Sequence, residues 1–129
     1  MFEINWEFDH IHYLCKDLEA SEKFFIEGMG GELEKRRFVK GNPTTNIRIG
    51  GVVIFLRPAR VDEPIGPAGP SRFGTDHIGL KTKNLYETAA ELKKRGVEFE
   101  IEPYELAPGT HVAFVKGPDA VRIELLQRD

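Results

Sequence analysis

An internal repeat limits the fold of this chain more than any other feature of its sequence. Two segments recur without a gap at a constant offset of 67 (77 minus 10): Asp9-His10-Ile11 as Asp76-His77-Ile78, and Lys16-Asp17-Leu18 as Lys83-Asn84-Leu85. In both copies an apolar stretch leads to an Asp or Asn that can cap a helix, and the helix formers that follow stop at glycine. These helices are predicted at residues 18–28 and 85–95. The chain is therefore expected to contain two copies of one supersecondary unit.

Strand patterns follow each predicted helix and complete the unit. Short apolar runs predict three strands after the first helix (33–39, 46–49 and 52–56) and three after the second (97–101, 111–115 and 121–126). The predicted breaks include residues 41–43 and 103–109. The fold class is thus α+β, with two βαβββ modules at residues 5–58 and 74–129 of a single domain, residues 1–129. The Pro- and Gly-rich stretch between them, residues 59–73, is expected to be a linker or a mobile lid.

Composition excludes several classes of function. The 129 residues are 40% hydrophobic, which is enough for a core, and the formal net charge of -3 comes without a basic block that could bind nucleic acid. No window approaches the roughly 20 apolar residues of a membrane helix, and the N-terminal residues lack the pattern of an export signal. A cytoplasmic protein without a membrane partner is expected. The single cysteine, Cys15, excludes an intrachain disulfide and a cysteine-rich metal site.

The repeat also aligns the last strands of the two modules, and this alignment brings in a carboxylate. Ile54-Phe55-Leu56 falls on Ile123-Glu124-Leu125 at an offset of 69 (124 minus 55), so Phe55 is the repeat partner of Glu124. If first and last strands lie side by side about a pseudo-twofold axis, positions 10, 55, 77 and 124 converge. Two imidazoles and one carboxylate leave about half of an octahedral metal open to substrate. His10, His77 and Glu124 are therefore predicted to bind a divalent metal ion, which could be Fe, Zn, Ni, Mn or Co.

Strand alternation assigns the neighbours of His10 to two faces. One face of the first strand carries His10, His12 and Leu14, and the other carries Ile11, Tyr13 and Cys15. His12 would lie beside the metal ligand, as a general base or as cavity lining. A lone histidine on a strand is more often structural than a ligand, and it is the repeat that favours metal binding here.

Other side chains are weaker candidates. Arg48 and Arg57 alternate with apolar residues and could clamp an anionic substrate, although a solvated charge is an equal interpretation. His111 is expected to be an exposed histidine, and Tyr104 is expected either to cover a pocket mouth or to pack. Cys15, on the helix-facing side of its strand, is expected to be inert.

These segments resemble the vicinal oxygen chelate superfamily, which includes glyoxalase I, methylmalonyl-CoA epimerase, extradiol dioxygenases and the fosfomycin and bleomycin resistance proteins. The likeness covers nearly the whole chain and rests on the two Asp-His-Ile segments, on Asn84-Leu85 and on residues 114–125. It implies that the modules form an eight-stranded cup and that His10, His77 and Glu124 bind the metal. It also implies a homodimer, as in much of the family.

The chain departs from the family pattern at Phe55. The resemblance puts a fourth ligand, Glu or Gln, at this position in glyoxalase I and the epimerase, and glyoxalase I uses a carboxylate there in proton transfer. Phenylalanine can do neither, which leaves a His, His, Glu triad similar to that of extradiol dioxygenases. Their pattern, however, has Tyr where Phe114 stands. Gly117 for the usual Asp and Ala120 for the usual Gly alter a turn more than a site.

We interpret the sequence as that of a metal-dependent enzyme, dioxygenase-like or glyoxalase-like, in which the metal chelates a small substrate through vicinal oxygens and acts as a Lewis acid. His12 is the candidate for proton transfer, and Phe55, Arg48 and Arg57 are the candidates for the substrate pocket. Two alternatives stay open. One is a noncatalytic protein that binds or sequesters a small molecule, as resistance proteins do. The other is an isomerase in which His12 or water replaces the missing carboxylate.

Overall fold

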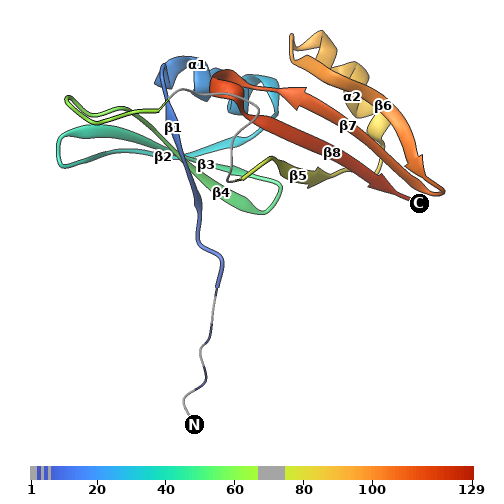
Figure 1. The fold of residues 1–129 in the computed structure, drawn as a ribbon, viewed down its shortest axis with the longest axis horizontal. Helices are drawn as coiled ribbons and strands as arrows, with labels where there is room; N and C mark the ends of the chain where they lie inside the picture. The colour runs from blue at the N-terminus through green and yellow to red at the C-terminus, as the bar shows by residue number, and fades with distance from the viewer. Residues whose placement is uncertain (1–2, 4, 6, 67–74) are drawn as a thin grey trace.

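The structure is a computed structural model that describes residue 3, residue 5, residues 7–66 and residues 75–129. Each half of the chain forms a four-stranded sheet with helix packed against it (Figure 1). The elements of the first half are β1 (Ile11–Cys15), α1 (Leu18–Lys23), the π-helical turn η1 (Phe24–Gly28), β2 (Glu32–Val39), β3 (Asn42–Ile49) and β4 (Val52–Pro58). Those of the second half are β5 (Ile78–Lys81), α2 (Leu85–Lys94), β6 (Glu98–Ala107), β7 (Thr110–Lys116), the short 3-10 helix η2 (Pro118–Ala120) and β8 (Arg122–Arg128).

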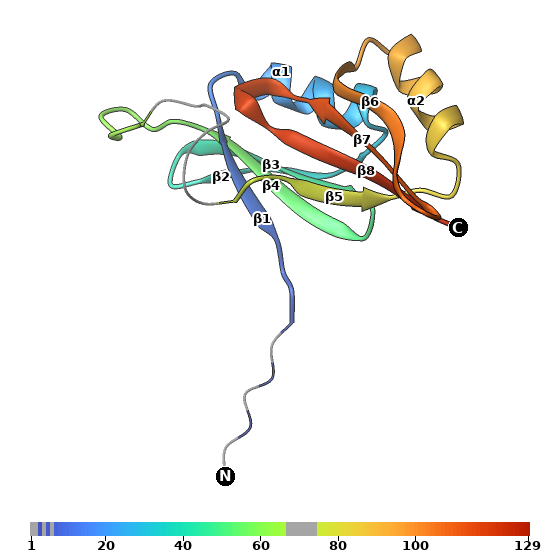
Figure 2. The same ribbon diagram turned by 45° about the vertical axis from the view of Figure 1, so that its right-hand side comes forward.

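The expected α+β fold with two βαβββ modules is confirmed. The strand orders are β1-β4-β3-β2 and β5-β8-β7-β6, so the two sheets have the same topology. Within the described residues these sheets do not close into a barrel. Figure 2 shows α1 and α2 on the same side of the molecule, above the sheets. This arrangement leaves the opposite face of each sheet without a helix.

The strand register confirms the alignment of the repeats. In each module the first strand pairs in parallel with the last, which places His12 opposite Phe55 and Gly79 opposite Glu124. Residues 12 and 79 differ by 67, and residues 55 and 124 differ by 69, as the sequence alignment requires. Phe55 is therefore the structural counterpart of Glu124.

The predicted breaks at residues 41–43 and 103–109 are present but shorter than expected, because the strands extend through a proline in each and leave turns at residues 40–41 and 108–109. Pro43 lies near the start of β3, opposite Phe38, and Pro103 lies within β6. Proline is tolerated at strand starts, at bulges and on edge strands, where no ladder bond is lost. β6 is an edge strand, and its register with β7 shifts between Ile101 and Tyr104.

The helix starts differ between the copies. Asp17 caps α1 as predicted, since its carboxylate accepts a hydrogen bond from Ala20 N at 3.1 Å. Asn84 precedes α2, but its side chain makes no capping bond to the described residues. The amide oxygen of Gln127 from β8 accepts from Leu85 N at 2.7 Å instead. The first turn of α2 is thus tied to the sheet rather than to its own leading residue.

The two modules share one core. Side chains buried against each other come from both halves of the chain, among them Phe25, Ile54, Leu56, Leu85, Val115 and Ile123. Of the predicted linker, residues 59–66 are described, and residues 67–73 lie outside the described part of the chain. Among the helices of the described segments, none has the length and apolar character required to span a bilayer.

Candidate metal and substrate site

The second module holds two of the predicted metal ligands next to each other. His77 immediately precedes β5, and its Nδ1 lies 2.7 Å from Asp76 Oδ2. Its other nitrogen, Nε2, lies 3.7 Å from Oε1 of Glu124, which projects from β8. Metal bonds of about 2.0–2.2 Å place adjacent ligand atoms roughly 3.0–3.5 Å apart. The pair is therefore close to the spacing of two neighbouring ligands, with the histidine oriented by a carboxylate, as is usual at metal centres.

The first module repeats this arrangement with one substitution. His10 Nδ1 lies 2.6 Å from Asp9 Oδ2, as in the second copy. Phe55 takes the place of the carboxylate, and its ring stacks on His10 with centroids 3.8 Å apart and an interplanar angle of 15°. His12 approaches Phe55 edge-on, at 5.7 Å. This half therefore offers one imidazole ligand beside an aromatic surface.

The two half-sites do not meet within one chain. Across residues 7–66 and 75–129, no three His, Cys, Asp or Glu side chains are grouped closely enough to hold a metal ion, so His10 is not gathered with His77 and Glu124. The expected convergence of positions 10, 55, 77 and 124 is not seen. Positions 10 and 55 lie together on the first sheet and positions 77 and 124 on the second, and the packing of the two sheets keeps these pairs apart. The three-ligand metal site stays a prediction.

Both arginines predicted for the pocket have carboxylate partners. Arg48 pairs with Glu34 at 2.9 Å, and Arg57 makes two bonds to Glu63, at 2.8 and 2.7 Å. The hydrogen bond from Arg57 lowers the pKa of Glu63 to about 2. The positive charges of both arginines are thus compensated. This pairing favours neither an arginine that is free to bind an anionic substrate nor a fully solvated side chain.

Sequence reasoning missed Arg37, which lies on the same face as Phe55. Its Cζ is 4.6 Å from the Phe55 ring centroid, and its Nε donates to Asn46 Oδ1 at 3.0 Å. Arg37 lies in a run of three basic residues, 35–37, and no spacing in the sequence distinguishes it from its neighbours.

Two further predictions concern single side chains of β1, His12 and Cys15. Burial, followed by the charges of Arg57 and His10, lowers the pKa of His12, which favours its neutral imidazole. Cys15 is buried, its Sγ donates to Arg57 O at 3.2 Å, and burial raises the pKa of the thiol. The expectation of an inert cysteine is thus supported.

The other two candidates lie in the second module. His111, expected to be an exposed histidine, is partly buried and has two partners. Its Nδ1 lies 2.9 Å from Tyr86 Oη, and its Nε2 lies 3.3 Å from Asp129 Oδ2. Tyr104 lies on β6 and is 43% exposed, without a part in the pocket described next.

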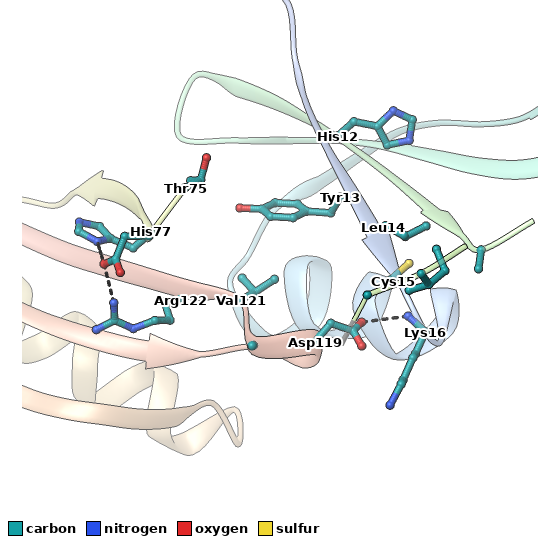
Figure 3. A pocket seen from close by; sticks show the side chains of 15 residues that line it. His12, Tyr13, Leu14, Cys15, Lys16, Thr75, His77, Asp119, Val121 and Arg122 are labelled. Atoms are coloured by element: carbon teal, nitrogen blue, oxygen red, sulfur yellow. Dashed lines mark hydrogen bonds and ion pairs between the residues drawn. The ribbon is translucent and has the colours of Figure 1, made fainter. Parts of the chain in front are cut away.

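A pocket of about 510 Å³ lies between the modules, a volume suited to a small molecule. Its walls include His12 and Tyr13 from the first module and Thr75, His77, Val121 and Arg122 from the second. Figure 3 shows the Tyr13 side chain extending from β1 toward Thr75 and His77. Burial raises the pKa of Tyr13 to about 12, so its phenol stays neutral and can donate a hydrogen bond.

Comparison with known proteins identifies the family. The model of the Glyoxalase/Bleomycin resistance protein/Dioxygenase superfamily matches residues 7–125. The chain belongs to this superfamily. One relative, a probable lactoylglutathione lyase of Vibrio parahaemolyticus, is 33% identical over 120 residues, covering 86% of this chain and 83% of the relative. A probable chloroplastic lactoylglutathione lyase of Arabidopsis thaliana is 28% identical over 92% of this chain, which spans 35% of that relative's length.

Solved structures of superfamily members show the same fold. A glyoxalase family protein from Bacillus cereus gives a TM-score of 0.79 at 18% identity, covering 98% of this chain and 96% of that one. A glyoxalase family protein from Enterococcus faecalis gives 0.76 at 22% identity, covering 94% and 97%. At these identities the likeness extends to the fold of the superfamily and not to a particular reaction.

Proposed function

We propose that this superfamily member is a divalent-metal-dependent enzyme that acts on a small oxygenated substrate in a glyoxalase-like manner. The observation that carries the proposal is the 3.7 Å approach of His77 Nε2 to Glu124 Oε1, with Nδ1 held by Asp76. The relatives named probable lactoylglutathione lyases support the same class. A bound divalent ion would act as a Lewis acid that polarises the substrate's oxygen atoms.

The third ligand in this proposal is His10, and it comes from a second copy of the chain. His10 carries the same Asp-oriented imidazole as His77, which leaves its Nε2 available, but it is not grouped with His77 and Glu124 in its own chain. In a twofold dimer the first module of one copy can complete the second module of the other. The proposal therefore includes a homodimer.

Phe55 cannot transfer a proton, because its ring has no acidic or basic atom. His12 is our candidate for that role, since its ring lies edge-on to Phe55 and 6.0 Å from the ring of His10, with which it enters the intermolecular site. Phe55, Arg48 and Arg57 stay our candidates for contact with the substrate on the first sheet, although none of them lines the pocket between the modules of one chain.

Metal content tests the proposed ligands. Protein purified without chelator is expected to contain one divalent ion per chain, and His10→Ala and Glu124→Ala are each expected to lose it. His111→Ala, which alters a histidine of the Tyr86 and Asp129 contacts, should retain the metal. Stoichiometric metal in both of the first two variants would show that the ligand assignment is wrong.

Mixing the two variants tests the intermolecular site. After His10→Ala and Glu124→Ala chains are unfolded together and refolded, random pairing in a twofold dimer restores about a quarter of the sites. A site built within one chain would regain no metal. The two arrangements are thus separated by one metal measurement.

The type of reaction is tested by isotope exchange. A glyoxalase-like enzyme should exchange a proton on a carbon next to a carbonyl with solvent deuterium, without consuming oxygen. Oxygen consumption coupled to ring or carbon–carbon cleavage would favour the dioxygenase interpretation instead.

A noncatalytic binding protein is the second candidate. It is favoured by the separation of the half-sites, which leaves a pocket of about 510 Å³ between the modules without three grouped ligands beside it. This function predicts tight binding of a small molecule that chelator treatment does not weaken and that leads to no product.

A further inference from the structure

Each module places one arginine over a phenylalanine beside its Asp–His pair, but the two arginines differ in their charge partners. Arg122 Cζ lies 4.7 Å from the Phe114 ring centroid, and the guanidinium bonds to Glu100 at 2.9 Å and to Asp76 at 2.6 Å. Arg37 lies over Phe55 at 4.6 Å, but it projects from β2 rather than from the last strand of its module, and it forms no ion pair with any described carboxylate. The positive charge is therefore compensated in the second module and not in the first.

Arg37 is nevertheless held in position. Its Nε donates to Oδ1 of Asn46, a β3 residue that is only 8% exposed, and its guanidinium lies against the Phe55 ring. Neither terminal nitrogen of Arg37 bonds to the described residues. A partly buried guanidinium with two free donor groups is suited to bidentate binding of a planar anion.

The surroundings of Arg37 also favour an anion from solution. Phe55 stands where the repeat has Glu124 in the other module, so the carboxylate that would repel an anion is missing here. The other arginines of this sheet, Arg36, Arg48 and Arg57, are paired with Glu22, Glu34 and Glu63. Among the arginines of this sheet, Arg37 is the one without a partner among the described carboxylates, and its single positive charge matches one negative charge.

We propose that Arg37, placed by Asn46 and Phe55, binds a carboxylate of the substrate, so that the substrate is a small organic acid. The Phe55 ring stacks on His10 at 3.8 Å, which puts the carboxylate on the same face as that ligand. The substrate assignment rests on the proposed function, whereas the anion site itself can be measured without metal or turnover.

The test is binding of propionate and of its uncharged analogue propionamide to metal-free protein. Side-chain Nε–H signals of ¹⁵N-labelled arginine report the contact, and the Arg37 signal is the one that Arg37→Gln removes. Propionate should shift this signal saturably, and propionamide should bind at least about tenfold more weakly, because a charge-assisted pair is lost. The Arg37→Gln variant should bind propionate more weakly by a similar factor, and its backbone amide signals measure this binding.

Two variants sharpen the result. Arg36→Gln removes a neighbouring charge that is paired with Glu22, and it should leave propionate binding unchanged. Asn46→Asp keeps the side-chain shape but gives Arg37 a carboxylate partner, so it should weaken propionate binding even if Arg37→Gln does not fold.

Several outcomes would overturn the proposal. Equal binding of propionate and propionamide, or unchanged binding in both Arg37→Gln and Asn46→Asp, would show that Arg37 holds no carboxylate. Tighter binding of inorganic phosphate would overturn the organic-acid assignment. If Arg37→Gln changes only dimer dissociation, the partner of Arg37 is a carboxylate of a second copy. Absence of metal from the purified protein would contradict the proposed function, but it would not affect the anion site, because propionate binding is measured on metal-free protein.

Discussion

At the scale of single residues, one oxygen atom of Asp76 contacts both a predicted metal ligand and an arginine. Its Oδ2 lies 2.7 Å from His77 Nδ1 and 2.6 Å from Arg122 Nη1. The bond to His77, with help from the charge of Arg122, lowers the pKa of Asp76. A fully ionised carboxylate keeps the Nδ1 proton of His77 and directs Nε2 toward Glu124.

Asp76→Asn should weaken metal binding about 10–100-fold while leaving the ligand atoms in place, because an amide orients the imidazole less strongly. Competition with a chelating dye measures the affinity. Asp62→Asn is the matched control, since Asp62 is exposed and its positive φ of 65° is one that Asn adopts readily. An equal affinity in wild type and Asp76→Asn would mean that Asp76 does not orient a ligand.

The Arg57–Glu63 pair predicts a pH dependence of folding stability. Because the pKa of Glu63 is about 2 in the folded chain against an ordinary value of 4.5, the pair stabilises the fold above about pH 4.5. This contribution should disappear as the pH falls from 4.5 to 2. Urea unfolding at several pH values should show a smaller acid loss of stability for Glu63→Gln over this window. Parallel curves for the two proteins would contradict the pairing.

At the scale of secondary structure elements, the start of α2 gives the clearest contrast between sequence and structure. Asn84 is the residue that capping preferences select, whereas the observed acceptor for Leu85 N is Gln127 of β8, 42 residues after Leu85. Local preference correctly locates the helix. Local preference does not identify Gln127 as the cap, because this residue reaches the helix start only through the pairing of β5 with β8.

Gln127→Ala should therefore destabilise the protein by about 1 kcal/mol, the usual cost of losing a helix cap. Asn84→Ala should cost only a few tenths of that energy, because its side chain makes no capping bond to the described residues. Thermal or urea unfolding of the two variants measures the difference. A larger loss for Asn84→Ala would reverse the assignment.

The elements were predictable from sequence to different extents. The repeat located the helices and the parallel partners in β4 and β8, because it records a duplicated backbone. The sequence made the breaks at Pro43 and Pro103 too long, since whether a proline ends a strand depends on whether the neighbouring strand needs its N–H. The faces of β1 followed from alternation alone. The separation of the half-sites was not predictable, because the packing of one sheet against another leaves no local pattern.

At the scale of the whole molecule, Gly117 joins the modules. A Cβ at this position would lie 2.7 Å from Cε2 of Phe24, whose ring packs from η1 of the other module. Sequence comparison marked Gly117 only as an altered turn. In the structure it is a close contact between the halves.

Gly117→Ala should destabilise the protein by about 1–3 kcal/mol, as expected for overpacking, and should loosen the contact between modules. Gly66→Ala is the control, because no atom of the described residues lies within 4 Å of its added Cβ. Denaturant unfolding measures the stability, and the double variant with Phe24→Leu should recover part of the loss. Equal stabilities of the two alanine variants would show that Phe24 yields without cost.

The pairing of each first strand with the last strand of its own module has an evolutionary consequence. His10 and Phe55 belong to one sheet, and His77 and Glu124 belong to the other. A substitution at position 55 therefore leaves the surroundings of position 124 in the same chain intact. After duplication, one copy could lose its carboxylate while the other kept it, so the halves of this chain can diverge separately without losing their common backbone.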